Sequence, residues 1–149
     1  MKLFLLAAAA TLALPAADLG EFKTVYLLPM SNGLDQFLAI KLTSGAVMQV
    51  VTDPTKADAI LTDHIGTSFE EKLDELYGKK PKDKDKDDQN GRTGMQNASR
   101  GRGAIFLVDR KTRDVIWSVY ERPKSTAPDD MTRTAEKIAQ KLEKDRKGK

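Results

Sequence analysis

A charged segment near the middle of this chain limits which parts of it can form a folded core. The segment runs from Lys79 to Gly103 and reads "KKPKDKDKDDQNGRTGMQNASRGRG". It has no leucine, isoleucine, valine or aromatic side chain, so it cannot bury enough apolar surface to offset the entropy lost on ordering. We therefore expect residues 79–102 to be a disordered insert, and the fold to be built from the two flanking parts.

The part before the insert, residues 18–78, predicts alternating strands and helices. A strand is expected in "EFKTVYLLPM", and the apolar residues of "LDQFLAIKL" recur at helical spacing. "AVMQVV" predicts a short buried strand, and "ADAILTDHIG" predicts a third strand. A second helix is expected in "FEEKLDELY", where the preceding Thr-Ser and the following glutamates have the spacing of a capping box.

The part after the insert, residues 103–149, predicts a hairpin and a long helix. "GAIFLVD" and "DVIWSVYERP" flank the polar "RKTR", which is the pattern of two strands joined by a turn. "DDMTRTAEKIAQKLEKDRKGK" is acidic at its start and basic at its end, which suits the helix dipole. The fold class expected is α/β (α+β), with one mixed sheet of about five strands, two to three packed helices and the order β-α-β-β-α-insert-β-β-α.

Both faces of this sheet are expected to be apolar. Strand alternation places Trp117 on one face and Ile116 and Tyr120 on the other, while Tyr26 in the first strand lies opposite Val25. A sheet covered on one side only would alternate apolar and polar residues, so we expect the helix before the insert to cover the second face. The alternative is that part of this face is left open for a partner or a second copy. Trp117 itself is expected in the core.

The hairpin sequence "AIFLVDRKTRDVIWSVYE" resembles small exported bacterial domains of the TolB N-terminal and curli-channel periplasmic type, with Asp109, Thr112 and Trp117 in matching places. "ADAILTDHIG" resembles the strand that follows the first strand-helix-strand unit of those domains, with Asp58 and Gly66 in matching places. The resemblance covers most of the chain outside the leader and the insert, and its motifs are structural. It implies a protein-binding or assembly role in the cell envelope, without catalysis.

The chain departs from that pattern at two points. The families usually have glycine after the threonine, where this chain has Arg113, so the geometry of their hairpin turn is not carried over. The chain also has no cysteine, so it lacks the residue to which envelope relatives commonly attach a lipid.

The first 17 residues, "MKLFLLAAAATLALPAA", have the layout of a secretory signal peptide. One lysine precedes an apolar run that is shorter than the roughly 20 residues needed to span a bilayer. We expect cleavage after Ala16 or Ala17, no membrane span after leader cleavage, and a periplasmic or extracellular location. A single domain would then comprise residues 18–78 and 103–149, interrupted by the insert.

The insert suggests two kinds of ligand. A calcium loop needs glycine at position 6, but counting from Asp83 places Asp88 there, so we expect no such loop. Arg92, Arg100 and Arg102 stand among glycines, as in arms that follow a phosphate backbone, although the insert has no aromatic residue on which bases could stack. Because export removes a protein from most nucleic acid, nucleic acid is not the expected partner. Salt-sensitive binding of nucleic acid or anionic surfaces remains an alternative function.

His64 is the only histidine, and without cysteine it has no partners for a metal site. Strand alternation is expected to point Asp63 and His64 to opposite faces. The chain also lacks the GxSxG turn that presents a nucleophilic serine in many hydrolases. We expect no catalytic, metal or cofactor site. The opposing hypothesis, a hydrolase, predicts a cleft that gathers Asp53, Asp63 and His64.

The expected function is therefore a non-catalytic protein-binding or assembly factor of the bacterial cell envelope. Its partners would be other envelope proteins or a second copy of the chain. The surface expected to bind them combines a sheet face with the basic insert, and comprises Tyr26, Ile116, Tyr120, Arg92, Arg100 and Arg102.

Overall fold

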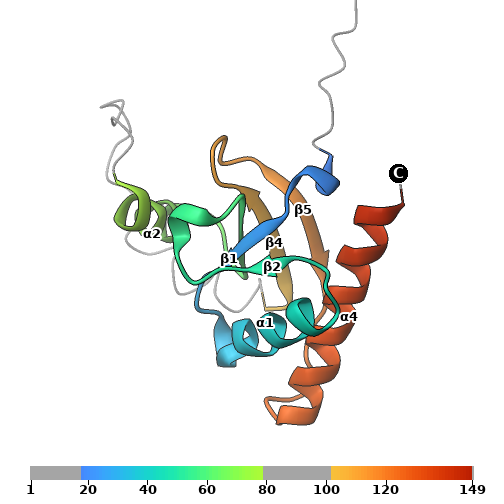
Figure 1. The fold of residues 1–149 in the computed structure, drawn as a ribbon. Coiled ribbons are helices and arrows are strands. Elements are labelled where there is room, and N and C mark those ends of the chain that lie inside the picture. Colours follow the sequence, from blue (N-terminus) through green and yellow to red (C-terminus); the bar gives the residue numbers. More distant parts are fainter. Residues whose placement is uncertain (1–17, 79–101, 149) are drawn as a thin grey trace, which may run out of the picture.

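The computed structural model describes residues 18–78 and 102–148 (Figure 1). The expected leader and the insert up to residue 101 lie outside the described residues. The strands and helices are β1 (Thr24–Leu27), α1 (Leu34–Ser44), β2 (Gln49–Val50), β3 (Ala59–Thr62), α2 (Thr67–Tyr77), β4 (Ala104–Asp109), β5 (Val115–Tyr120) and α4 (Pro128–Lys147). The predicted fold class and the predicted order of elements are confirmed.

The five strands form one mixed sheet in the order β2-β1-β3-β4-β5. β1 pairs in parallel with both β2 and β3, whereas β4 is antiparallel to both of its neighbours. The two edges of the sheet differ in length, because β2 has two residues and β5 has six. β5 is therefore the only long edge strand among the described residues.

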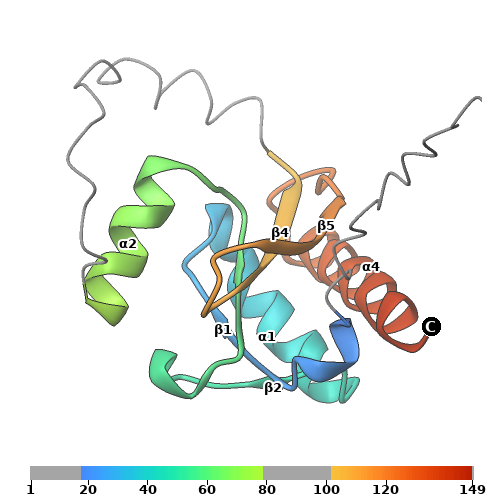
Figure 2. The same ribbon diagram turned by 90° about the horizontal axis from the view of Figure 1, so that it is seen from above.

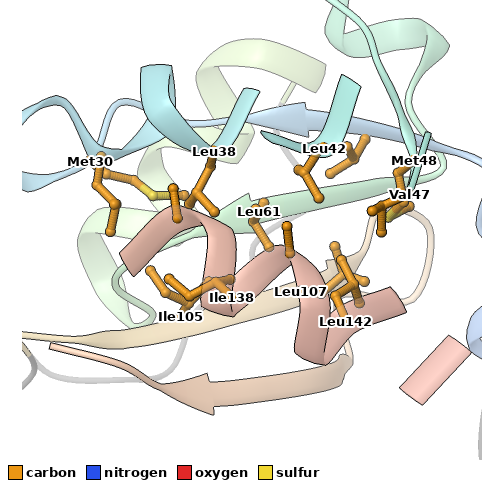
Figure 3. Packing of buried hydrophobic residues seen from close by; sticks show 14 of the residues in the cluster. Met30, Leu38, Leu42, Val47, Met48, Leu61, Ile105, Leu107, Ile138 and Leu142 are labelled. Carbon is orange, nitrogen blue, oxygen red and sulfur yellow. The ribbon is translucent and has the colours of Figure 1, made fainter. Parts of the chain in front are cut away.

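α1 and α4 pack against one face of the sheet and enclose the main core (Figures 1 and 3). Figure 3 shows side chains of both helices meeting those of β3 and β4, and those that are at most 1% exposed include Leu38, Leu42, Leu61, Leu107, Ile138 and Leu142. Each such side chain contributes about 1.5–3 kcal/mol of hydrophobic free energy. The helix predicted in "LDQFLAIKL" thus buries Leu34, Leu38 and Leu42.

α2 packs on the opposite face of the sheet and closes a second, smaller core. Its Phe69 and Leu73 cluster with Leu28, Ile60 and Val108 of the sheet side. Figure 2 shows α2 on one side of the sheet and α1 with α4 on the other. The expectation that this helix covers the second face is confirmed over the central strands. Among the described residues, however, none from β5 belongs to the cluster.

A bulge in β5 changes which of its residues share a face. Leu107 pairs with Trp117, but Val108 pairs with Val115, so Ile116 is an extra residue in the strand. Ile116 packs against the core formed by α1 and α4, as Trp117 does. The prediction that Ile116 shares a face with Tyr120 is wrong, because the bulge interrupts the alternation on which that prediction rests.

The capping box predicted for α2 does not form. Gly66 is the residue that precedes the helix, and no side chain caps the first turn. The Glu70 carboxylate instead accepts a hydrogen bond from the Arg113 guanidinium at 2.8 Å. The Glu70 side chain is thus used in an ion pair to a distant turn and not in a local cap.

The strand predicted in "AVMQVV" is shorter and less buried than expected. β2 comprises only Gln49–Val50, and Gln49 is exposed. The buried side chains of this stretch, Val47 and Met48, come before the strand and contribute to the main core. β2 lies at an edge of the sheet, where only β1 pairs with it.

Candidate functional site

Asp58, one of the five residues matched by the resemblance, joins the start of β3 to the start of β1. Its Oδ2 accepts the backbone N–H groups of Lys23 at 2.9 Å and of Thr24 at 3.0 Å. The Thr24 hydroxyl in turn accepts the Asp58 N–H and donates to the carbonyl of Lys56, each at 2.9 Å. These bonds align β1 with β3, so Asp58 has a structural place in the fold.

The pKa of Asp58 leads to a testable prediction. Burial raises this pKa, but the hydrogen bonds from Lys23 and Thr24 outweigh that effect and hold it below the ordinary value of 3.8. A lowered folded-state pKa adds stability that is complete above the unfolded-state pKa and is lost as the pH falls through the folded-state value. Because this side chain is exposed and solvent screens its charge, we expect Asp58→Asn to lower the free energy of unfolding by no more than about 1 kcal/mol near neutral pH.

Urea denaturation of both proteins across a pH series measures this effect. The difference in unfolding free energy between wild type and Asp58→Asn should shrink as the pH falls below about 4. Asp114→Asn, which changes an exposed carboxylate in the hairpin turn, is the control and should follow the wild type. A difference that stays constant down to about pH 2 would contradict the assigned hydrogen bonds.

Asp109 and Thr112, which the resemblance also matches, build the turn between β4 and β5. The Asp109 Oδ1 accepts the backbone N–H of Lys111 at 2.8 Å, and the Thr112 hydroxyl accepts that of Asp114 at 3.3 Å. Both side chains therefore satisfy backbone donors that no strand partner reaches. This is the hydrogen bonding that makes Asp and Thr favourable in turns.

Arg113 completes this turn in a conformation that favours glycine. Its φ is 66°, in the left-handed region. Its side chain is only 10% exposed, and its guanidinium lies 2.8 Å from the Glu70 carboxylate and 3.7 Å from that of Asp74, both on α2. These ion pairs offset the backbone strain and attach the hairpin turn to α2.

The last two matched residues are also held in structural positions. Trp117 is 8% exposed, and its Nε1 donates to a carboxylate oxygen of Asp145 on α4 at 2.8 Å. The expectation that Trp117 belongs to the core is confirmed. Gly66 has a φ of 111°, which side chains rarely adopt, and its carbonyl accepts the first helical bond of α2 from Glu70.

Asp63 and His64 are in contact, so the prediction that they point to opposite faces is wrong. The Nδ1 of His64 lies 2.7 Å from the Oδ1 of Asp63. β3 ends one residue before Asp63, so strand alternation no longer separates the two side chains. Burial raises the pKa of Asp63, but hydrogen bonds from Ser31 and His64 lower it overall. Asp53 instead accepts hydrogen bonds from Thr55, and no contact among the described residues joins it to this pair.

The remaining candidates for small ligands are few. In residues 18–78 and 102–148, no three side chains of the metal-binding types gather closely enough to hold an ion. A cavity of about 240 Å³ lies between α1 and α4, lined in part by Lys41, Glu136 and Gln140, and none of the sequence-predicted residues lines it. Within the same described ranges, every helix is too short or too polar to cross a membrane.

Exposed apolar side chains of the sheet occur on β5, where α2 does not cover the second face. Tyr120 is 62% exposed and Val115 is 46% exposed. Of the other predicted contact residues, Tyr26 is half-buried beside α2, and Ile116 is half-buried against the main core. The predicted sheet-face surface is therefore reduced to Tyr120 and its neighbours on β5.

Basic residues lie at the same end of the hairpin as Tyr120. The Gly103 carbonyl accepts the N–H of Glu121 at 2.8 Å, so Arg102 and Arg122 occupy adjacent chain segments there. Both arginines and the following Lys124 are exposed. None of the three forms an ion pair within the described part of the chain. This end of the sheet thus offers positive charge to a partner.

The carboxylate that adjoins Arg122 in sequence is already engaged. Glu121 accepts a hydrogen bond from the Lys141 ammonium of α4 at 2.8 Å, which lowers the pKa of that carboxyl. Arg92 and Arg100, the other predicted basic contacts, lie outside the described residues. We call Ser118, Tyr120, Arg122 and Arg102 the β5 edge surface.

Sequence reasoning missed Ser118, Arg122 and Lys124. Ser118 interrupts the apolar run of its strand, which is a signal that one side of the strand is not buried. That signal does not say whether the strand lies at an edge, because sheet order depends on pairing between distant segments.

No family model, curated protein or solved structure matches this chain.

Proposed function

We propose that this protein is a non-catalytic, exported protein-binding or assembly factor of the bacterial cell envelope. The observation that carries the proposal is the β5 edge surface. Among the described residues, it combines an edge strand that pairs on one side only, a tyrosine that is 62% exposed, and arginines without ion pairs. Tyrosine and arginine are the residues most enriched where proteins bind one another.

The five matched residues support the same proposal. Asp58 and Asp109 bind backbone N–H groups, and Trp117 bonds to Asp145. Their polar groups are thus used to hold the sheet and the hairpin in place. This agrees with the protein-binding or assembly role, without catalysis, that the TolB and curli-channel resemblance implies.

Affinity capture from a bacterial envelope extract tests the proposed function. Wild-type protein should recover defined envelope proteins, and Tyr120→Glu should recover about tenfold less of them, because a central aromatic contact is replaced by a charge. Ile40→Glu is the matched control, since Ile40 is also an apolar side chain that is 63% exposed but lies on α1. Failure of the wild type to retain any envelope protein would count against the proposal.

A variant in which a Gly-Ser linker replaces residues 79–101 distinguishes the proposed protein binding from the alternative function, binding of nucleic acid or anionic surfaces. If the bound material is nucleic acid or another anionic polymer, its binding should fall steeply with salt and disappear with the insert. If it is an envelope protein held by the β5 edge surface, it should be retained by this variant.

A further inference from the structure

The outer edge of β5 has backbone groups directed away from the sheet. Because Glu121 donates its N–H to Gly103, the hydrogen-bonded positions of the antiparallel ladder on β5 are Glu121, Val119 and Trp117. The N–H and C=O groups of Ser118 and Tyr120 therefore point away from β4. No strand among the described residues lies on that side.

Apart from the bulge at Ile116, the edge lacks the features by which proteins usually prevent strand addition. Proline, lysine and inward-pointing charges are the common means of blocking an exposed edge, and none occurs between Val115 and Tyr120. The bulge at Ile116 affects only the end next to the hairpin turn, so the strand beyond it stays regular. β2, at the other edge, is too short to guide a partner strand.

The side chains beside this edge indicate the chemistry of a partner. Trp117 and Val119 pack against the main core, so Ser118 and Tyr120 lie on the other side of the sheet, where β5 is left uncovered. Arg122 follows at the same end, with Arg102 in the adjacent segment. A strand placed beside β5 would meet backbone donors and acceptors, a tyrosine ring and two guanidinium groups.

We propose that the β5 edge surface binds an acidic segment of a partner protein, which adds as an extended sixth strand beside β5. This inference rests on the proposed protein-binding function and specifies how the partner is held. Main-chain hydrogen bonds to Ser118 and Tyr120 supply affinity, as in other cases of strand addition. Carboxylates of the partner complement Arg102 and Arg122, and these charges favour an acidic sequence over a basic one.

A second copy of the chain fits this edge less well. The outward positions of β5 carry Ser118, Tyr120 and Arg122, and none of these side chains is acidic. The nearest carboxylate, that of Glu121, is bound to Lys141. Within β5 of a second copy, therefore, no residue supplies a carboxylate for Arg122, and the exposed Asp114 lies outside the strand, in the hairpin turn.

Selection from a displayed library of random peptides of about ten residues, long enough to form a strand, tests the proposal with the full-length protein. The selected peptides should be enriched in aspartate or glutamate and in β-branched residues. The tightest of them, labelled with a fluorophore, then serves as the probe for titrations with variants.

Ser118→Pro is the decisive variant. Proline removes the outward N–H of residue 118 but leaves the ladder to β4 intact, because that N–H is not used there. It should weaken peptide binding by about tenfold, the loss expected for one or two hydrogen bonds. Ser118→Thr retains the N–H and is the matched control. Circular dichroism and urea denaturation verify that each variant is folded.

Arg122→Glu tests the charge requirement without altering the strand. It should weaken binding of the acidic peptide by about tenfold, and a peptide with lysines in place of its carboxylates should bind this variant better than the wild type. This swap also keeps the proposal testable if Ser118→Pro does not fold.

The proposal would be overturned by selection of peptides without acidic residues, or by binding that neither Ser118→Pro nor Arg122→Glu changes. It would also be overturned by a wild-type dimer in sedimentation that Ser118→Pro dissociates, which would assign the edge to a second copy. Binding of an oligonucleotide that depends on Arg122 but not on Ser118 would overturn it as well. If envelope capture succeeds with Ser118→Pro unchanged, the protein-binding function stands and only the strand-addition mode fails.

Discussion

Leu107→Ala is expected to lower the free energy of unfolding by about 3–5 kcal/mol. Leu107 is fully buried in β4, between α4 and the sheet, and its loss leaves a cavity that rigid neighbours on both sides cannot fill (Figure 3). Small domains have a total unfolding free energy of about 5–15 kcal/mol, so this single change removes a large part of it. Urea denaturation followed by tryptophan fluorescence measures the effect, since Trp117 pairs directly with Leu107.

Val115→Ala is the matched control on the neighbouring strand. Val115 is 46% exposed, so its truncation should change the unfolding free energy by less than about 0.5 kcal/mol. Equal losses for the two variants would mean that the open side of β5 is covered in the folded protein. That result would also remove the basis for the β5 edge surface.

Gly103→Ala is expected to destabilise the protein by about 2–4 kcal/mol. Gly103 has a φ of 103°, and an added Cβ would lie 3.0 Å from the Cα and Cβ of Arg122. The substitution therefore strains the backbone and forces apart the two segments that carry Arg102 and Arg122. Binding through the β5 edge surface should weaken together with stability, because these segments position its charges.

Gly78→Ala is the control that distinguishes the cost of backbone strain from the cost of the steric clash with Arg122. Gly78 has a φ of 83° and a ψ of 157°, a combination that is nearly exclusive to glycine, but among the described residues no atom lies within 4 Å of an added Cβ. Its substitution should cost about 1–3 kcal/mol, from backbone strain alone. The difference between the two alanine variants in thermal or urea denaturation then measures the contact with Arg122. Equal effects would contradict the close approach of Gly103 to β5.

The pattern of apolar residues was sufficient to predict the elements of this fold and their order. β3 reads as "AILT" and α4 carries its buried residues at helical spacing, and both patterns depend only on neighbours a few positions away. The hairpin was predicted for the same reason, from two apolar runs about a short polar turn. In each case the information is local, so the sequence by itself determined the fold class.

The candidate site required contacts between distant segments. In the sequence, Arg113 was notable only because the resembling families usually have glycine at that place. The structure pairs it with Glu70, which lies on the other side of the insert. Likewise the contact of Asp63 with His64 depends on where β3 ends, which its pairing partners decide.

Tertiary structure alone decided that β5 is an open edge. The apolar pattern showed that both faces of the sheet bury side chains, and it predicted that the helix before the insert would cover the second face. It did not show that α2 reaches over β3 and β4 but leaves Tyr120 exposed. Nor did it show that a bulge places Ile116 on the face that packs against the main core. Strand order and helix placement are set by packing among segments far apart in the chain, so the binding surface emerges only when those segments are assembled.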